Sequence, residues 1–214
     1  MTKHQAPGTV YGVILNDAAS VQALGDLDAA PYKGAPKTPV LYIKPDNTRV
    51  AGGAVVTLPA GAQTVEVAAT VGLVLGRATS RVGVADALAC VGGLVLAADL
   101  SLPHASYYRP AIREKCFDGA LPLSPVQPVR DLAGLELLTQ IDGQEVERRS
   151  LSELLRSPAQ LLAEISDWMT LQAGDVLLVG VRYQAPQARV GSRVRISADG
   201  LGSVEFSLAA GEGA

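Results

Sequence analysis

Hydrophobic and polar residues alternate along the stretch TVEVAATVGLVLG, residues 64–76. Val65, Val67, Ala69 and Val71 would point to one side of a strand, and the residues between them to the other. Glu66 is the one acid on that second side. The pattern predicts a long strand, and it leaves two interpretations of Glu66: a metal ligand, or a charged residue at a strand start.

Other segments also have strand patterns. In LELLTQIDGQEVERRS, residues 135–150, Asp142-Gly143 stands between two strands and predicts a hairpin with a two-residue turn. Pro45 ends the strand VLYIKP. Further strands are expected in 9–17, 40–45, 52–61, 95–102, 173–181, 192–198 and 202–208.

Helix signals are fewer. Residues 18–29 predict a short helix or a lid-like loop, and 85–94 a short helix with glycines near its end. Ser150 and Glu153 have the spacing of a capping box ahead of a helical pattern, in which Pro158 would begin a second segment. Residues 103–125 have little periodicity and predict a long irregular connection, which is often functional.

These elements predict one β-rich α+β domain over residues 1–214, with 1–8 and 209–214 frayed. The net charge of −3 and the absence of a basic run give no footprint for nucleic acid. The most apolar stretch contains Asp86 and Asp99, so we expect no membrane span. Cys90 and Cys116 stand in unlike contexts, which favours a reduced, cytoplasmic location.

Several kinds of catalytic site are excluded by the residues available. The sequence contains neither a phosphate-binding loop nor a Gly-x-Ser-x-Gly motif. His4 and His104 are its only histidines, too few and too far apart for a zinc site with two unlike cysteines.

Polar residues gather around the predicted irregular connection. Asp99 closes an apolar strand, where a carboxylate either faces a pocket or caps a turn. Arg109, Arg113 and Lys115 either bind carboxylates or form a solvated loop face. Lys44, at the end of another strand, is by itself an edge-strand charge.

The order of five segments resembles the fumarylacetoacetate hydrolase family. They are YIKPDNT (42–48), ATVGLVLGR (69–77), AADLSLP (97–103), YYRPAIREKCFDG (107–119) and LQAGDVLLVG (171–180). The resemblance covers about residues 10–200, and the fourth segment points to the N-terminal half of the two-copy isomerase/decarboxylases of 4-hydroxyphenylacetate degradation. It implies a mixed β-sheet rolled into a barrel-like core, with a few peripheral helices.

The resemblance also implies a divalent cation, Mg²⁺ or alternatively Mn²⁺ or Ca²⁺, that is held by three carboxylates and chelates a 2-oxo acid. Two of the three ligand positions hold no carboxylate here, because they fall on Ala68 and Thr70. Glu66 is two positions too early, and the third position falls on Asp99. We therefore expect Asp99 and Glu66 as candidate ligands, in a chain that need not bind the metal itself.

Other family positions are kept in part. The strand lysine falls on Lys44 and the loop lysine on Lys115, our candidate catalytic residues, while Arg109, Tyr107 and Asp118 are candidates for substrate binding. The Gly-Thr-Pro that helps hold a substrate carboxylate reads Gly180-Val181-Arg182. The lid after Asn16 lacks the family's His…Glu pair.

The resemblance predicts a subunit of an isomerase/decarboxylase that acts on a dicarboxylic or tricarboxylic 2-oxo acid. Its partner would be a related subunit with the complete metal site, or a second copy of this chain. Two alternatives stay open: a non-catalytic partner that keeps the fold, or an independent 2-oxo acid hydrolase or decarboxylase with a shifted metal site at Glu66.

Overall fold

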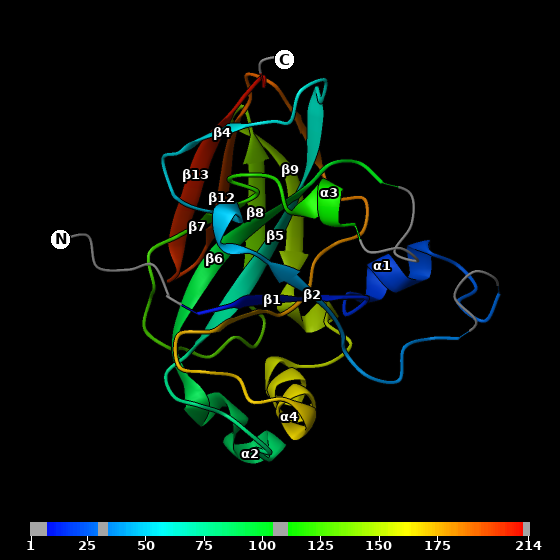
Figure 1. The fold of residues 1–214 in the computed structure, drawn as a ribbon, viewed down its shortest axis with the longest axis vertical. Helices are drawn as coiled ribbons and strands as arrows, with labels where there is room; N and C mark the ends of the chain where they lie inside the picture. Colours follow the sequence, from blue (N-terminus) through cyan, green and yellow to red (C-terminus); the bar gives the residue numbers. More distant parts are fainter. Residues whose placement is uncertain (1–7, 30–33, 105–110, 212–214) are drawn as a thin grey trace.

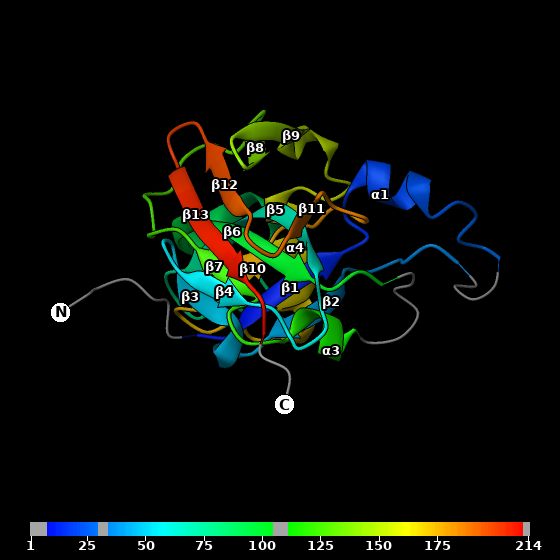
Figure 2. The ribbon, with the colours of Figure 1, turned by 90° about the horizontal axis from the view of Figure 1, so that it is seen from above.

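A computed structural model describes residues 8–29, 34–104 and 111–211. These residues form two β-sheets, one of eight strands and one of five, with short helices around them (Figure 1). Viewed from above, β12 and β13 of the smaller sheet lie over β5 and β6 of the larger one (Figure 2). The larger sheet curls into half a barrel, so the expected mixed, barrel-like α+β fold is confirmed.

The eight-stranded sheet mixes parallel and antiparallel pairs. β1 is parallel to β10 and β3 to β7, whereas the other neighbours are antiparallel. Its spatial order is β2 (Val40–Lys44), β1 (Val10–Ile14), β10 (Val176–Leu178), β5 (Thr64–Leu75), β6 (Val91–Ser101), β7 (Leu121–Leu123) and β3 (Arg49–Ala51), with β11 (Gln187–Arg189) paired to β5.

The five-stranded sheet contains the predicted hairpin. Asp142 and Gly143 have φ of 53° and 80°, the left-handed pair that a tight two-residue turn requires. Its spatial order is β4 (Val55–Thr57), β13 (Gly202–Ala209), β12 (Arg193–Ala198), β8 (Glu136–Ile141) and β9 (Gln144–Ser150).

The two faces of the long strands β5 and β6 lie in different environments. Val65, Val67, Ala69 and Val71 enter the main core between the sheets, as the alternation predicts. The opposite face of β5, which starts with Glu66, lines the inside of the half barrel. Side chains on that face are therefore enclosed by the strands of the curled sheet.

The helices are short and peripheral. α2 (Val84–Ala87) packs against α4 (Pro158–Trp168) at one end of the molecule, and α1 (Ala18–Ala23) lies to one side (Figure 1). α3 (Ile112–Lys115) contacts β6. The 3-10 turns are η1 (Asp46–Thr48), η2 (Leu88–Cys90) and η3 (Leu151–Glu153). No helix in the three described stretches is long and apolar enough to cross a membrane.

The helix predicted over 85–94 is wrong in its second half. α2 and η2 end at Cys90, and β6 begins at Val91, so Gly92 lies in a strand. A Cβ on Gly92 would lie 2.8 Å from the Cα of Gly76. The glycines here permit close approach of two backbones and do not end a helix.

Two further expectations need correction. Ser150 caps only the turn η3, and the capping box that starts α4 is formed by Ser157 and Gln160. The connection 103–125 is not irregular throughout, because it contains α3 and β7. Near the chain ends, Gly8 N donates to Gly174 O, and Ala209 belongs to β13.

Candidate functional site

Asp99 is the centre of a buried cluster on the inner face of the half barrel. It lies in β6 directly opposite Ala68 of β5, and none of its side chain is exposed. Lys115 Nζ donates to its Oδ2 at 2.9 Å, and the Tyr42 hydroxyl donates to the same oxygen. Lys44 Nζ lies 2.6 Å from Oδ1. A carboxylate without access to water needs such partners, because desolvation of an unpaired charge is very costly.

Lys44 is held by backbone oxygens as well as by charge. Its ammonium donates to the carbonyls of Leu100, Lys115 and Ala120 at 2.9, 2.6 and 3.0 Å. These three bonds use its three protons, so Asp99 Oδ1 has the charge of Lys44 beside it but accepts no hydrogen bond of good geometry from a described residue. Lys44 thereby joins β2, β6 and the end of α3.

The pKa values of this cluster follow from burial and pairing. Burial lowers the pKa of Lys44 to about 8, against the opposing charge of Asp99. Burial alone would raise the pKa of Asp99, but the charges of Lys115 and Lys44 and the hydrogen bond from Lys115 outweigh it and hold that pKa at about 2. At neutral pH the Asp99 carboxylate is therefore ionised beside the ammonium group of Lys44.

Tyr42 is a member of the cluster that sequence reasoning did not find. Its ring lies below Lys115 Nζ, 4.9 Å from the ring centroid, a distance typical of a cation–π contact. The ring passes over Gly12 of β1, where a Cβ would overlap it. Tyr42 and Lys44 are two residues apart in one strand and share a face, which is the signal that could have identified it.

The two remaining ligand positions implied by the resemblance do not form a cation site. Ala68 packs with Val181 and Ala185, and Tyr42 and Ile14 lie against this group. Thr70 is opposite Ala97 and is fully buried. Within the described stretches, no group of three or more His, Cys, Asp or Glu side chains could hold a metal ion. The residues present therefore do not fit a divalent cation, which prefers several oxygen ligands.

Glu66 belongs to a neighbouring polar group. It lies opposite Ser101, two residues along β5 from Ala68, a step of about 6–7 Å in a strand. Ser101 Oγ lies 3.2 Å from His104 Nδ1. Burial raises the pKa of Glu66, and the charges of His104 and Lys115 oppose this effect. Glu66 thus lies beside the cluster, one cross-strand pair on the same face away from the pair of Ala68 and Asp99.

Of the three proposed substrate-binding residues, the structure describes only Asp118. Tyr107 and Arg109 lie outside the described residues. Asp118 is exposed, and its Oδ1 accepts a hydrogen bond of 2.7 Å from Asn47. Asn47 also donates to the carbonyl of Cys116, so this contact fastens the loop after α3 to the turn η1.

A second buried ion network surrounds Arg149 of β9, which sequence reasoning also missed. β10 pairs with β5 at Gly72–Val74 and β11 pairs with it at Thr64–Glu66, which leaves a gap along this edge of β5. Arg149 Nη1 fills the gap by donating to Ala69 O at 3.0 Å and to Gly180 O at 3.2 Å. Its Nε donates to Asp17 Oδ2 at 3.1 Å.

Asp17 connects this network to α1. Its Oδ1 accepts from the backbone N and the hydroxyl of Ser20 and so caps the helix. Arg182, in the position after Val181, lies 3.6 Å from Asp17 and donates to Glu153 at 2.7 Å. The segment after Asn16, which includes α1, is therefore held against the sheet by the ion pairs of Asp17 with Arg149 and Arg182.

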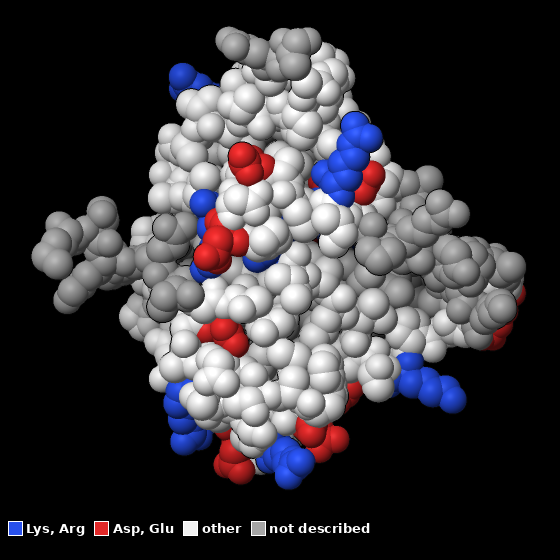
Figure 3. Space-filling model, in the orientation of Figure 1, with Lys and Arg blue, Asp and Glu red and all other residues white. Residues whose placement is uncertain are grey.

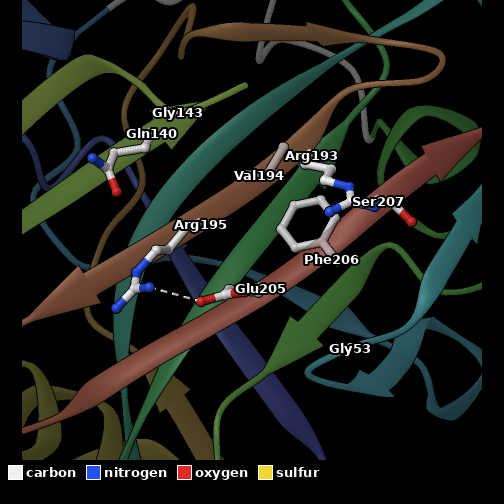
Figure 4. A pocket seen from close by; sticks show the side chains of 9 residues that line it. All are labelled: Gly53, Gln140, Gly143, Arg193, Val194, Arg195, Glu205, Phe206 and Ser207. Atoms are coloured by element: carbon white, nitrogen blue, oxygen red, sulfur yellow. Dashed lines mark ion pairs between the residues drawn. The ribbon is translucent and has the colours of Figure 1, made fainter.

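A surface hollow lies away from this cluster. About 380 Å³ in volume, it is on the outer face of the five-stranded sheet, where Arg195 of β12 pairs with Glu205 of β13 at 2.9 Å (Figure 4). None of the candidate residues that the structure describes lines it. Acidic and basic side chains are interspersed over the face in Figure 3, which gives no single-sign patch there.

The fold and the Asp99–Lys44–Lys115 cluster define the class of protein. The family model described as fumarylacetoacetate (FAA) hydrolase C-terminal matches residues 9–209, and the chain belongs to this family. It is 39% identical over 204 residues to the 4-hydroxyphenylacetate degradation bifunctional isomerase/decarboxylase of Salmonella dublin. That match covers 95% of this chain and 47% of the relative, so the chain spans about half the relative's length.

Solved structures agree with the fold. The 5-carboxymethyl-2-hydroxymuconate delta-isomerase of Mycobacterium smegmatis has a TM-score of 0.83 and 27% identity, covering 96% of this chain and 80% of its own. The fumarylpyruvate hydrolase of Pseudomonas aeruginosa, with Mn²⁺ and pyruvate bound, has a TM-score of 0.81 and 22% identity, covering 95% and 90%. At that identity the second comparison shows the fold alone.

Proposed function

We propose that this chain is a subunit of an isomerase/decarboxylase of 4-hydroxyphenylacetate degradation. The proposed reactions are decarboxylation of 5-carboxymethyl-2-oxohex-3-ene-1,6-dioate and isomerisation of the resulting 2-hydroxyhepta-2,4-diene-1,7-dioate. The observation that carries the proposal is the similarity across 95% of this chain to a bifunctional relative about twice as long. The free cysteines Cys90 and Cys116 are in keeping with a cytoplasmic enzyme.

The chain's own residues have separate roles in this proposal. Lys115 is the candidate for contact with a substrate carboxylate or for proton transfer, because it uses one of its three protons on Asp99 and keeps 9% of its side chain exposed. Lys44 donates all three protons to backbone carbonyls, which favours a positioning role. Arg109, Tyr107 and Asp118 remain proposed substrate contacts.

We further propose that the divalent cation, Mg²⁺ or Mn²⁺, is bound by a second family copy with the full set of carboxylates. That copy is either a different chain or, less in keeping with the substituted positions Ala68 and Thr70, a second copy of this one. The proposal makes the two-copy relative the template for the assembly, since this chain matches 47% of it.

The test is reconstitution of activity. The purified chain is assayed with 5-carboxymethyl-2-oxohex-3-ene-1,6-dioate and Mg²⁺ or Mn²⁺, alone and mixed with a family copy that carries all three carboxylates. We expect little decarboxylation by this chain alone. The rate of the mixture should be clearly higher than the rate of the second copy alone. The matched control is the same mixture with the Lys115→Met variant, which should lose the gain.

Each other outcome selects an alternative. Failure of any gain, with stable association of the two copies, would indicate a non-catalytic partner. Activity of the lone chain that disappears in Glu66→Ala would indicate an independent enzyme with a shifted site, and would exclude the subunit proposal.

A further inference from the structure

We infer that the Asp99 cluster is a metal-independent cationic centre, in which two lysines outweigh one aspartate and no divalent cation is bound by this chain. The inference deepens the proposed function by assigning the state of this copy's site. It rests on that proposal only for the identity of the 2-oxo acid ligand.

The charge of the cluster opposes the binding of a cation. Lys44 and Lys115 supply two positive charges within 3 Å of the Asp99 carboxylate, which leaves a net charge of +1 on these three groups, with the neighbouring Glu66 outside the count. A divalent cation would meet two like charges and one opposite charge here. Repulsion of this kind is strong where the side chains are as buried as they are here.

The oxygens of Asp99 are already occupied by other partners. Its Oδ2 already accepts hydrogen bonds from Lys115 and Tyr42, and Oδ1 faces Lys44 at contact distance. A cation could reach Oδ1 only if Lys44 moved. Lys44 is fixed by three carbonyl oxygens, so such a movement would leave those buried acceptors unpaired.

The residues of β5 beside Asp99 supply no carboxylate at positions 68 and 70. Ala68 stands directly opposite Asp99, and the side chains of Val181 and Ala185 cover it. Two carboxylates at positions 68 and 70 would change the net charge of the cluster to −1, and a divalent cation would return it to +1. Replacement of two carboxylates by Ala68 and Thr70, together with loss of a divalent cation, would therefore leave the net charge unchanged.

The same charge has a consequence for ligands. A site that keeps +1 without a metal still attracts a carboxylate, and Lys115 is the member of the cluster with unused donors among the described residues. The centre is thus suited to hold an anionic group without chelating it.

The decisive experiment is a Mn²⁺ titration of the full wild-type chain after treatment with EDTA, followed by the electron paramagnetic resonance of free Mn²⁺ and by the melting temperature. We expect no stoichiometric binding and no change in melting temperature with EDTA or Mn²⁺. Binding of one Mn²⁺ per chain, abolished in the Asp99→Asn variant, would overturn the inference.

A pair of variants tests the compensation of charge. Ala68→Glu/Thr70→Glu should bind Mn²⁺ at least about tenfold more tightly than wild type, because it restores oxygen ligands. Its melting temperature should fall in EDTA and recover with Mn²⁺. Ala68→Gln/Thr70→Gln, of equal size but uncharged, should show no recovery.

The outcomes of this test are independent of the reconstitution assay, since none of them reads activity. If the folded Glu variant fails to recover with Mn²⁺, the charge argument is wrong. If that variant does not fold, the wild-type titration with Asp99→Asn as its control still decides. Failure of the proposed reaction would leave the metal result unchanged.

Discussion

At the scale of single residues, Asp99 determines how the inner face of the half barrel is built. Its carboxylate is the common partner of Lys44, Lys115 and Tyr42, which come from β2 and α3. Removal of one partner of a buried ion pair is far more damaging than replacement of the whole pair, because a charge is left uncompensated. We therefore regard Asp99 as the residue on which these segments depend.

Low pH should reduce the free energy of unfolding, because Asp99 becomes protonated. Its pKa is about 2 in the folded chain and near 3.9 in an unfolded one, so the unfolded chain takes up the proton first as the pH falls. The stabilisation is complete above about pH 4 and is lost towards pH 2, a loss of about 2 kcal/mol in the free energy of unfolding. Urea unfolding between pH 5 and pH 2 measures it.

The controls for this acid titration are two variants. Asp99→Asn has no carboxylate at this position to take up a proton, and it should show a smaller pH dependence over this range, from a lower starting stability. Asp118→Asn, which replaces an exposed acid, should behave as the wild type does. Equal pH dependence in Asp99→Asn and wild type would show that another acid is responsible.

At the scale of elements, β5 depends on a side chain to complete its edge. Between β10 and β11, Ala69 O receives its hydrogen bond from Arg149 of the other sheet. The same guanidinium holds Asp17, the cap of α1. One residue thus links an edge of the large sheet, a strand of the small sheet and a peripheral helix.

Arg149→Met should be strongly destabilising, by roughly 3–5 kcal/mol, because it leaves the Asp17 carboxylate buried without its main partner. Its neighbour Arg148 is half exposed and pairs with Glu136 and Glu145, so Arg148→Met should cost less than about 1 kcal/mol. Comparison of the two by urea unfolding tests the role of the gap. Similar losses in both would contradict it.

Elements defined by local patterns could be predicted from the sequence, whereas those defined by tertiary contact could not. β5 and the β8–β9 hairpin follow from alternation and turn residues. The start of β6 was missed because Gly92 acts through the distant Gly76. Arg149 carries no local signal, since it looks like its exposed neighbour Arg148.

At the scale of the whole molecule, the two sheets share one core. Leu96 and Ala98 of β6 and Val194 and Phe206 of the smaller sheet belong to the same buried cluster. We propose that the chain folds as a single domain, because neither sheet could expose its core-facing side to water without loss of this burial.

Unfolding should accordingly be one cooperative transition. Leu96→Ala, at a fully buried position, should cost about 2–5 kcal/mol and shift the loss of both sheets together. Val55→Ala, at a residue that is 64% exposed, should have little effect. Hydrogen exchange of amides in β6 and β13 checks the coupling. Two separate transitions would indicate two units.

The pairing of Ala68 with Asp99 has a consequence for how the chain finds its register. A slip of one residue between β5 and β6 would turn Asp99 towards the main core, where Leu96, Ala98 and Leu100 now point. No lysine would meet it there, since Lys44 and Lys115 approach from the inner face. The same aspartate therefore disfavours, during folding, a pairing of β5 and β6 that is out of register.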